Sequence, residues 1–221
     1  MRRESMTTIS RTTPSSRSRT VFSALIDANV LFSLYIRDLI LELGISGIFQ
    51  PLWSPAILED THRALNRKGP RFGASFTKQV DIMNTVFPES LVTDYEHLLG
   101  TIGGVHPSDE HVLAAAIRRQ AGALVTFNLR HFPNDMFDSF GIELRHPDDF
   151  LLEQSDLAPH KVLAGLARQL VDYDRPHLAG IELAQIFAKN RCPQFSQYLA
   201  DHVEKIDALV MAMTNQRRSA P

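Results

Sequence analysis

The chain has 221 residues, a net charge of −2 and one cysteine, Cys192. Its length suits one α/β domain with an appendage better than two complete domains. The charge gives no global basic signature, so any nucleic-acid binding must use a local patch. A single cysteine excludes an intrachain disulfide framework and a cysteine-based zinc site.

Residues 1–20 are rich in Ser, Thr and Arg and contain almost nothing to bury, which predicts a disordered, mildly basic tail. This end of the chain lacks the apolar core of a secretory signal. No apolar run approaches the roughly 18 residues of a membrane span. Together with cysteine usage that fits a reducing compartment, these features predict a cytoplasmic protein with no membrane contact.

The motif LIDANVLF, residues 25–32, joins a predicted strand to a predicted helix. Residues 21–26 form the short apolar run of a strand covered on both faces. Residues 30–43 are apolar at helical intervals until Gly44 ends the pattern. In a parallel sheet, ligands gather beyond the carboxyl ends of the strands, where Asp27 would stand. The alternative is that Asp27 only caps the following helix.

A second acidic position follows the next predicted strand. Residues 48–53 are apolar and end at a Ser-Pro pair, a favoured helix start. The helix that begins there carries Glu59 and Asp60 in its first two turns, and Pro70 is expected to close it. A further amphipathic helix is predicted from apolar positions at helical spacing: Phe76, Val80, Met83 and Val86.

The block HPSDEHVLAAAIRRQAGALVTFNLRHFP, residues 106–133, predicts a helix followed by a strand. The helix is expected over residues 107–120, with Asp109 and Glu110 in its first turn and Gly122 as its stop. This is the third position at which acidic side chains stand at the start of a helix.

The strand of this block is expected over residues 123–126, and Asn128, Arg130 and His131 come directly after it. These three residues therefore stand at the same kind of strand end as Asp27. One more short strand is predicted over residues 142–144. The two aspartates at positions 148 and 149 are expected to cap a helix that begins at position 150.

From about residue 157 onward only helical patterns remain, which predicts an α-helical appendage. Three segments repeat apolar residues at helical spacing, over residues 162–170, 181–187 and 198–211. We expect these stripes to pack against the main domain; partner binding is the alternative use.

Strands alternating with helices predict a parallel sheet with helices on both faces, and right-handed crossovers bring the strand ends to one edge. Asp27 and Asn128 would lie there, within reach of the acids that open the intervening helices. Two carboxylates about 5 Å apart repel by roughly 3 kcal/mol at an effective dielectric of about 20, so a cation is expected among them. Ligation by oxygen alone favours Mg²⁺ or Mn²⁺ over zinc.

Such a site fits hydrolysis of a phosphodiester bond, because a bound cation can activate water and stabilise charge on a phosphoryl oxygen. Basic residues on the same segments could contact phosphates, although solvated helix faces are the alternative for each of them. These residues are Arg63, Arg67, Lys68, Arg118, Arg119 and Arg130.

Other catalytic signatures are absent from the sequence. There is no GxSxG elbow, no GxxxxGK[ST] phosphate loop and no GxGxxG motif. The histidines show no HExxH or comparable metal-binding spacing. Each is therefore interpreted as a surface or packing residue, except that His131 is a functional candidate beside Asn128.

Five motifs in order resemble the PIN-domain fold, a three-layer α/β/α arrangement around a parallel central sheet: LIDANVLF, WSPAILEDTHRAL, SDEHVLAAAI, LVTFNLRHFP and HPDDFLL. Within that fold the chain resembles the VapC-type toxins of bacterial toxin–antitoxin pairs. The resemblance implies a nuclease domain over residues 21–152. The C-terminal helical extension over residues 153–221 is similar to one found in a subgroup.

The resemblance implies a Mg²⁺- or Mn²⁺-dependent endoribonuclease that a cognate antitoxin silences. It also implies a homodimer, which is common in this family. By position, the metal ligands would be Asp27, Asp60 and Asp109, and Asn128 occupies the site often held by a fourth aspartate. Two residues would hold Asp27 in place, namely Asn29 and Thr126. The residues expected to contact RNA are Arg63, Arg67, Arg130 and His131.

The chain departs from the family pattern at several positions. The second helix usually offers glutamate where Asp60 stands, so Glu59 is a candidate substitute, and Glu110 competes with Asp109. Asn128 lacks a charge, which weakens the case for a second metal ion. These departures leave open a second hypothesis, a catalytically weak PIN-like module that binds RNA or protein. The third hypothesis is a metal-dependent DNA nuclease.

Overall fold

The computed structural model describes residues 21–173 and 178–219, so the tail predicted over residues 1–20 lies outside the described residues. A central sheet of four parallel strands has the order β2-β1-β3-β4. The strands are β1 (Ser23–Ile26), β2 (Gln50–Leu52), β3 (Ala123–Val125) and β4 (Glu143–Arg145).

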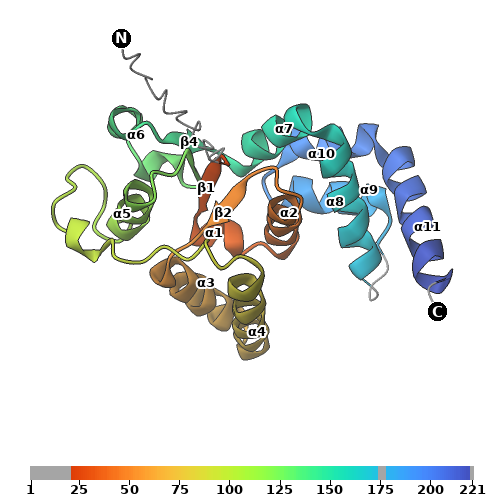
Figure 1. Cartoon of the computed structure of the whole chain (residues 1–221), viewed down its shortest axis with the longest axis horizontal. Coiled ribbons are helices and arrows are strands. Elements are labelled where there is room, and N and C mark those ends of the chain that lie inside the picture. Colours follow the sequence, from red (N-terminus) through yellow and green to blue (C-terminus); the bar gives the residue numbers. More distant parts are fainter. Residues whose placement is uncertain (1–20, 174–177, 220–221) are drawn as a thin grey trace, which may run out of the picture.

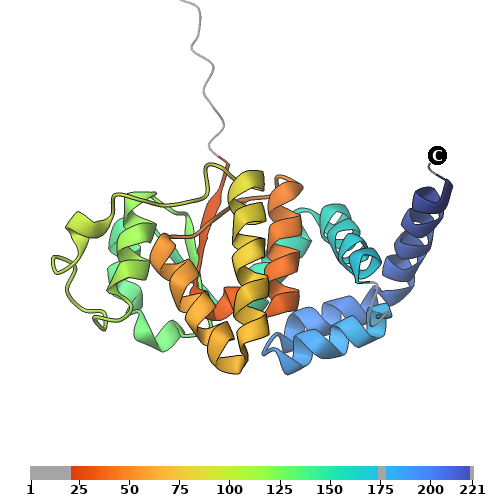
Figure 2. The same cartoon turned by 90° about the horizontal axis from the view of Figure 1, so that it is seen from below.

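Helices lie on both sides of this sheet (Figures 1 and 2), which confirms the predicted α/β/α fold. The part of the chain before α7 contains α1 (Ala28–Leu31), α2 (Leu34–Ile45), α3 (Pro55–Lys68), α4 (Pro70–Val86), α5 (Glu110–Arg118) and α6 (Asn134–Phe140), with the 3₁₀ turns η1 (Glu96–Leu98) and η2 (Leu129–His131). The C-terminal helices are α7 (Pro147–Leu157), α8 (Pro159–Asp172), α9 (Gly180–Lys189), α10 (Pro193–Asp201) and α11 (Val203–Ser219).

The register of β1 and β3 determines which side chains meet at the carboxyl edge. Ile26 stands opposite Val125, and the Asp27 N–H donates to the Val125 carbonyl at 3.0 Å. β1 and β3 are fully buried from Ala24 onward, as expected for inner strands of a parallel sheet. The residues that follow each strand therefore emerge side by side from the apolar core.

The single helix predicted over residues 30–43 is wrong, because the chain breaks between α1 and α2. Ser33 has an extended backbone (φ −80°, ψ 110°) and is the N-cap of α2. Gly44 does not end the helix either, since α2 continues to Ile45. A Cβ at Gly44 would lie 2.9 Å from the Pro51 ring on β2, so glycine allows this close helix–sheet approach.

α3 ends at Lys68, just before Pro70, as predicted, and Pro70 then begins α4, so α3 and α4 form a pair joined at Gly69. The limits of α5 differ from the prediction. α5 is shorter than predicted, and Gly122 is not its stop. Gln120 takes the left-handed conformation after α5 instead, with φ 48°.

The predicted capping by the aspartates at positions 148 and 149 is also wrong. α7 begins at Pro147, and the ring of His146 accepts the N–H of Asp148 at 3.2 Å. The buried Asp148 carboxylate accepts instead from the Gln194 and Phe195 N–H groups, at 3.0 and 2.7 Å. It therefore caps α10, a long-range contact that a local sequence pattern does not predict.

The C-terminal helices lie beyond α2 from the sheet (Figure 1), and polar contacts join α8 to α2. Arg168 pairs with Glu42 at 2.6 Å, and the Gln169 amide donates to the Tyr35 carbonyl at 2.9 Å. The expected packing on the main domain is thus present. The predicted third segment is divided at His202 into α10 and α11. The division at residues 152 and 153 stays a proposal, since α7 runs through it unbroken.

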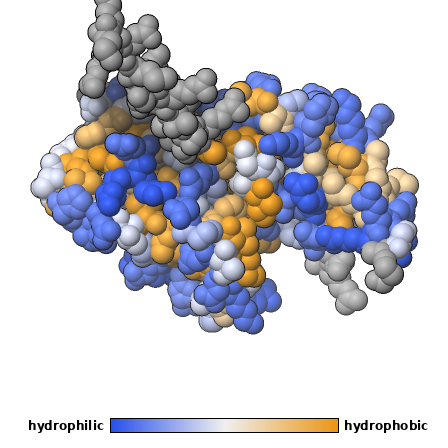
Figure 3. Space-filling model, viewed as in Figure 1, coloured by the Kyte–Doolittle hydropathy of each residue, from blue (hydrophilic) through white to orange (hydrophobic). Residues whose placement is uncertain are grey.

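The surface is mixed in character. Apolar side chains gather near the middle of the face drawn in Figure 3. Exposed apolar residues of α2 and α4 line a groove between these helices, namely Ile45, Ile82 and Val86. Within residues 21–173 and 178–219, no helix has the length and apolar content needed to cross a membrane.

Replacing Gly44 by alanine should destabilise the protein by about 1–3 kcal/mol, because the new methyl group would overpack against Pro51. Chemical denaturation would measure this. Gly165→Ala on α8 is the matched control, because its Cβ would meet Leu43 at an ordinary 3.4 Å. There alanine should stabilise by up to about 1 kcal/mol through helix propensity. Equal effects at both positions would contradict the assigned packing.

Candidate active site at the carboxyl edge of the sheet

Asp27 stands at the carboxyl end of β1 and is 8% exposed. Its Oδ2 atom accepts two hydrogen bonds of 2.6 Å, from the Asn29 amide and from the Thr126 hydroxyl. Asp27 occupies the N-cap position of α1 but makes no side-chain capping bond. Its carboxylate is therefore held mainly by Asn29 and Thr126 at the sheet edge, with a further contribution from the Ala28 N–H at the start of α1.

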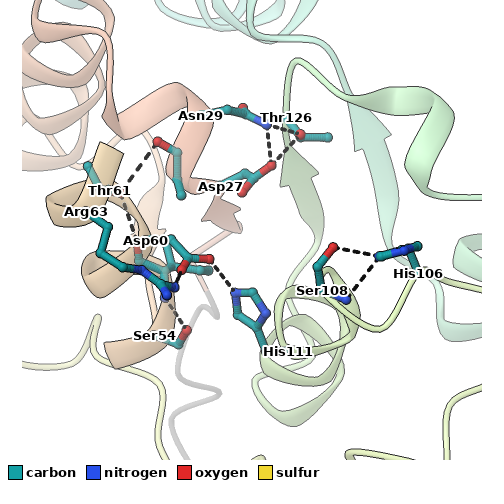
Figure 4. Close-up of polar contacts among 12 residues, drawn as sticks. Asp27, Asn29, Ser54, Asp60, Thr61, Arg63, His106, Ser108, His111 and Thr126 are labelled. Atoms are coloured by element: carbon teal, nitrogen blue, oxygen red, sulfur yellow. Dashed lines mark hydrogen bonds and ion pairs between the residues drawn. The ribbon is translucent and has the colours of Figure 1, made fainter. Parts of the chain in front are cut away.

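Asn29 joins the two segments that leave β1 and β3. Its amide nitrogen also donates to the Thr126 hydroxyl at 3.0 Å, and its oxygen accepts the Phe127 N–H at 3.0 Å. The Thr126 hydroxyl accepts in addition from the Asn128 N–H at 3.1 Å. The structure thus places Asn29 and Thr126 where the sequence predicted them, against Asp27 (Figure 4).

Burial raises the pKa of the Asp27 carboxyl above the ordinary value of 3.8. The Thr126 hydroxyl and the Ala28 N–H lower this pKa in opposition, while the negative charge of Asp109 raises it further. A buried carboxylate beside a second carboxylate is an arrangement in which a cation is strongly favoured.

Asp109 immediately precedes α5, and its Oδ2 atom lies 3.0 Å from Nδ1 of the half-exposed His131. His131 belongs to η2, which follows β3, so this contact connects the start of α5 with the loop over residues 126–133, the β3 loop. Asp109 and His131, distant in the sequence, therefore lie together, and the charge of Asp109 acts on Asp27.

Asp60 projects from α3 and is shared between two basic side chains. It pairs with Arg63 one turn later on the same helix, and its Oδ2 atom lies 3.4 Å from Nε2 of His111 on α5. Figure 4 shows Asp60 and His111 pointing toward each other, with Asp27 between α3 and α5. His111 also interacts electrostatically with Asp27. His111 therefore lies close to two of the predicted acids.

The alternative acids point elsewhere. Glu59 is exposed and lines a groove between α3 and α4 together with His62 and Phe76. Glu110 accepts the Gly100 N–H at 2.7 Å, so it holds the loop before α5. The geometry therefore favours Asp60 over Glu59 and Asp109 over Glu110.

The predicted RNA-contacting residues divide into two groups. Arg63 and His131 are paired with site acids, while Arg67 and Arg130 are exposed on α3 and η2. Asn128 is exposed at the start of η2. Two other basic candidates contact backbone carbonyls at the far end of α5: Arg118 bonds to residue 94 and Arg119 to residue 89.

Within residues 21–173 and 178–219, the side chains as they are placed form no group of three Asp, Glu, His or Cys that could hold a metal ion. The donor chemistry at the sheet edge nevertheless fits a hard cation, because Asp27 and Asp109 offer buried and half-buried carboxylate oxygens. Asp60 would complete the set only by turning away from Arg63.

His111 is the site residue that the sequence analysis missed. The sequence alone indicates a surface or packing residue there, because His111 belongs to no metal-binding motif. Its position two residues after Asp109, in the first turn of α5, was the available signal. Its buried Nε2 atom has no hydrogen-bond partner among the described residues, 21–173 and 178–219, and 3.4 Å is long for a bond to Asp60.

Comparison with known proteins agrees with this architecture. The family model described as PIN domain matches residues 23–130, and the model described as VapC50 C-terminal domain matches residues 147–201. The chain is 37% identical over 134 residues to the Putative ribonuclease VapC50 of Mycobacterium tuberculosis (strain ATCC 25618 / H37Rv). That alignment covers 55% of this chain and 76% of the relative. No solved structure matches significantly.

The chain therefore belongs to the PIN-domain family, in its VapC type, which confirms the resemblance inferred from the motifs. The C-terminal match begins at the first residue of α7. The extension is thus similar to a described C-terminal domain of this type.

Asp27→Asn should raise the melting temperature of the metal-free protein at pH 7 by a few degrees. An aspartate with a raised pKa in the fold destabilises the fold when ionised, and this penalty disappears as the pH falls below the ordinary value of 3.8. Thermal unfolding at several pH values should therefore show a gain that shrinks toward acid. Exposed Asp81→Asn is the control, and a less stable Asp27→Asn variant at pH 7 would indicate a structural role instead.

Proposed function

We propose that this protein is a ribonuclease of the VapC type, which hydrolyses RNA phosphodiester bonds at a Mg²⁺ or Mn²⁺ site on the sheet edge. The observation that carries the proposal is the buried Asp27 carboxylate, held by Asn29 and Thr126 beside Asp109. The relative named a ribonuclease supports the same reaction class.

Asp27 and Asp109 would hold the cation, with Asp60 as the third ligand after its release from Arg63. When bound, the cation supplies an activated water and stabilises charge on the scissile phosphate. Asn29 and Thr126 keep Oδ2 of Asp27 fixed, so the carboxylate needs little reorganisation. Burial strengthens the electrostatic interactions of this carboxylate.

Basic side chains at the rim would orient the RNA. Arg67 and Arg130 are exposed on α3 and η2, and Arg63 would become available to a phosphate when Asp60 turns to the cation. Asn128 adds no charge, so one cation is proposed and not two. His131 would steady Asp109 and face the substrate with its exposed edge.

The proposal includes the partners that the family suggests. A cognate antitoxin would silence the enzyme by placing a basic side chain in the acidic pocket. A homodimer and a cytoplasmic location are also part of the proposal.

Asp27→Asn and Asp109→Asn should each lower kcat on single-stranded RNA by at least about a hundredfold, because each removes a ligand charge. Asp60→Asn should lower kcat more than Glu59→Gln, which separates the two acids of α3. Cleavage should require Mg²⁺ or Mn²⁺ and stop with a chelator. Full activity of folded Asp27→Asn would contradict the assignment, and equal cleavage of matched DNA would point to a DNA nuclease.

Titration calorimetry with Mn²⁺ distinguishes the enzyme from a PIN-like module that only binds. The enzyme should take up one Mn²⁺ per chain, and Asp109→Asn should weaken the affinity by about tenfold or more. Asp81→Asn serves as the control because it removes an exposed acid away from the site. Absence of stoichiometric uptake, with RNA bound but uncut, would favour the binding module.

A further inference from the structure

The turn between α9 and α10 reaches the segments that carry the site. Arg191 donates to the Phe127 carbonyl at 3.2 Å, and its guanidinium lies 4.7 Å from the centre of the Phe127 ring. Its neighbour Asn190 accepts a 3.0 Å hydrogen bond from the Ser33 hydroxyl, which follows α1. One turn of the extension therefore contacts both the β3 loop and the chain that leaves β1.

A continuous set of contacts leads from Arg191 to Asp27. The Phe127 residue that accepts from Arg191 through its carbonyl also donates through its N–H to Asn29 at 3.0 Å. Asn29 in turn donates to Asp27 at 2.6 Å. Because Phe127 is bonded on both sides of its backbone, displacing its carbonyl would displace the donor that orients Asn29.

The Phe127 ring is held on two sides by residues outside the nuclease-like sheet. His146, the N-cap of α7, meets the ring edge-to-face with centroids 5.2 Å apart, and Arg191 covers it at 4.7 Å. One contact comes from the start of α7 and the other from the turn between α9 and α10. The extension therefore fixes the main chain and the side chain of the β3 loop.

The backbone of the turn suits this contact. Arg191 has φ 65°, a left-handed conformation that is uncommon for residues other than glycine. The neighbouring N–H of Cys192 donates to the Phe187 carbonyl at 3.0 Å, and Cys192 is fully buried. A non-glycine residue in this conformation, with its side chain on the site loop, favours a role for that side chain.

We propose that Arg191 is a positioning residue for the nuclease site. It acts through Phe127 and Asn29 on the Asp27 carboxylate, so that the C-terminal extension completes the geometry of the active site. The effect on kcat rests on the proposed function, because it can be measured only if the protein cleaves RNA. The order of the β3 loop can be tested without it.

The test uses the full chain with Arg191→Gly and Arg191→Lys. Glycine adopts φ 65° freely, so the first variant removes the side chain without straining the turn. Lysine keeps the charge but loses the planar group that stacks on Phe127. Lys189→Ala is the matched control, because it removes an exposed charge at the end of α9 that does not contact Phe127.

Arg191→Gly should lower kcat by about tenfold with KM within about twofold, because the site is misaligned and not emptied of substrate contacts. Arg191→Lys should recover part of kcat. Hydrogen exchange should become faster at the Phe127 and Asn128 amides, which donate to Asn29 and Thr126. The control should leave all three measurements unchanged.

Other results would overturn the proposal. A salt-dependent rise in KM with kcat unchanged, shared by Lys189→Ala, would make Arg191 a phosphate contact. Unchanged kcat, or unchanged exchange of the loop amides, would remove its positioning role. If the unmodified protein cuts no RNA, the proposed function fails. The exchange measurement would then still decide whether Arg191 orders the β3 loop.

Discussion

The hydrogen bonds that Asn29 and Thr126 donate to one oxygen of Asp27 are the contacts on which the site depends. They exist because β1 and β3 are neighbouring parallel strands in a register that brings Asp27 and Thr126 out side by side. Burial there disfavours the carboxylate charge, and Asp109 adds to the effect. The fold thus keeps an acid where its charge is destabilising, as is common at functional sites.

The two other acids, Asp60 on α3 and Asp109 immediately before α5, come from the helices between which Asp27 stands in Figure 4. Asp60 is neutralised by Arg63 and approached by His111, and Asp109 is paired with His131. Each of these two acids therefore has at least one basic side chain as a partner, while the charge of Asp109 still acts on Asp27. The C-terminal helices reach the same edge through Arg191 on Phe127. The site is thus supported from the sheet, from α3 and α5, and from the extension.

The sequence predicted the parallel sheet and the positions of Asp27, Asn29 and Thr126, because those features follow from apolar runs and from residues next to strand ends. It did not predict the break at Ser33, where the backbone becomes extended, or the role of Gly44, which depends on packing against Pro51 of β2. The helix cap made by Asp148 spans about 46 residues of chain, and no local pattern carries such a contact. The choices between Glu59 and Asp60, and between Asp109 and Glu110, needed side-chain directions, which only the structure supplies.

The central claim is that carboxylates from separate elements share one cation at the sheet edge. A crystal soaked in Mn²⁺ and read for anomalous scattering tests it directly. The account predicts one anomalous peak about 2.0–2.3 Å from carboxylate oxygens of Asp27 and Asp109, with Asp60 turned from Arg63 toward it. No peak at this edge in a well-occupied soak, or a peak bound only by surface residues elsewhere, would contradict the account.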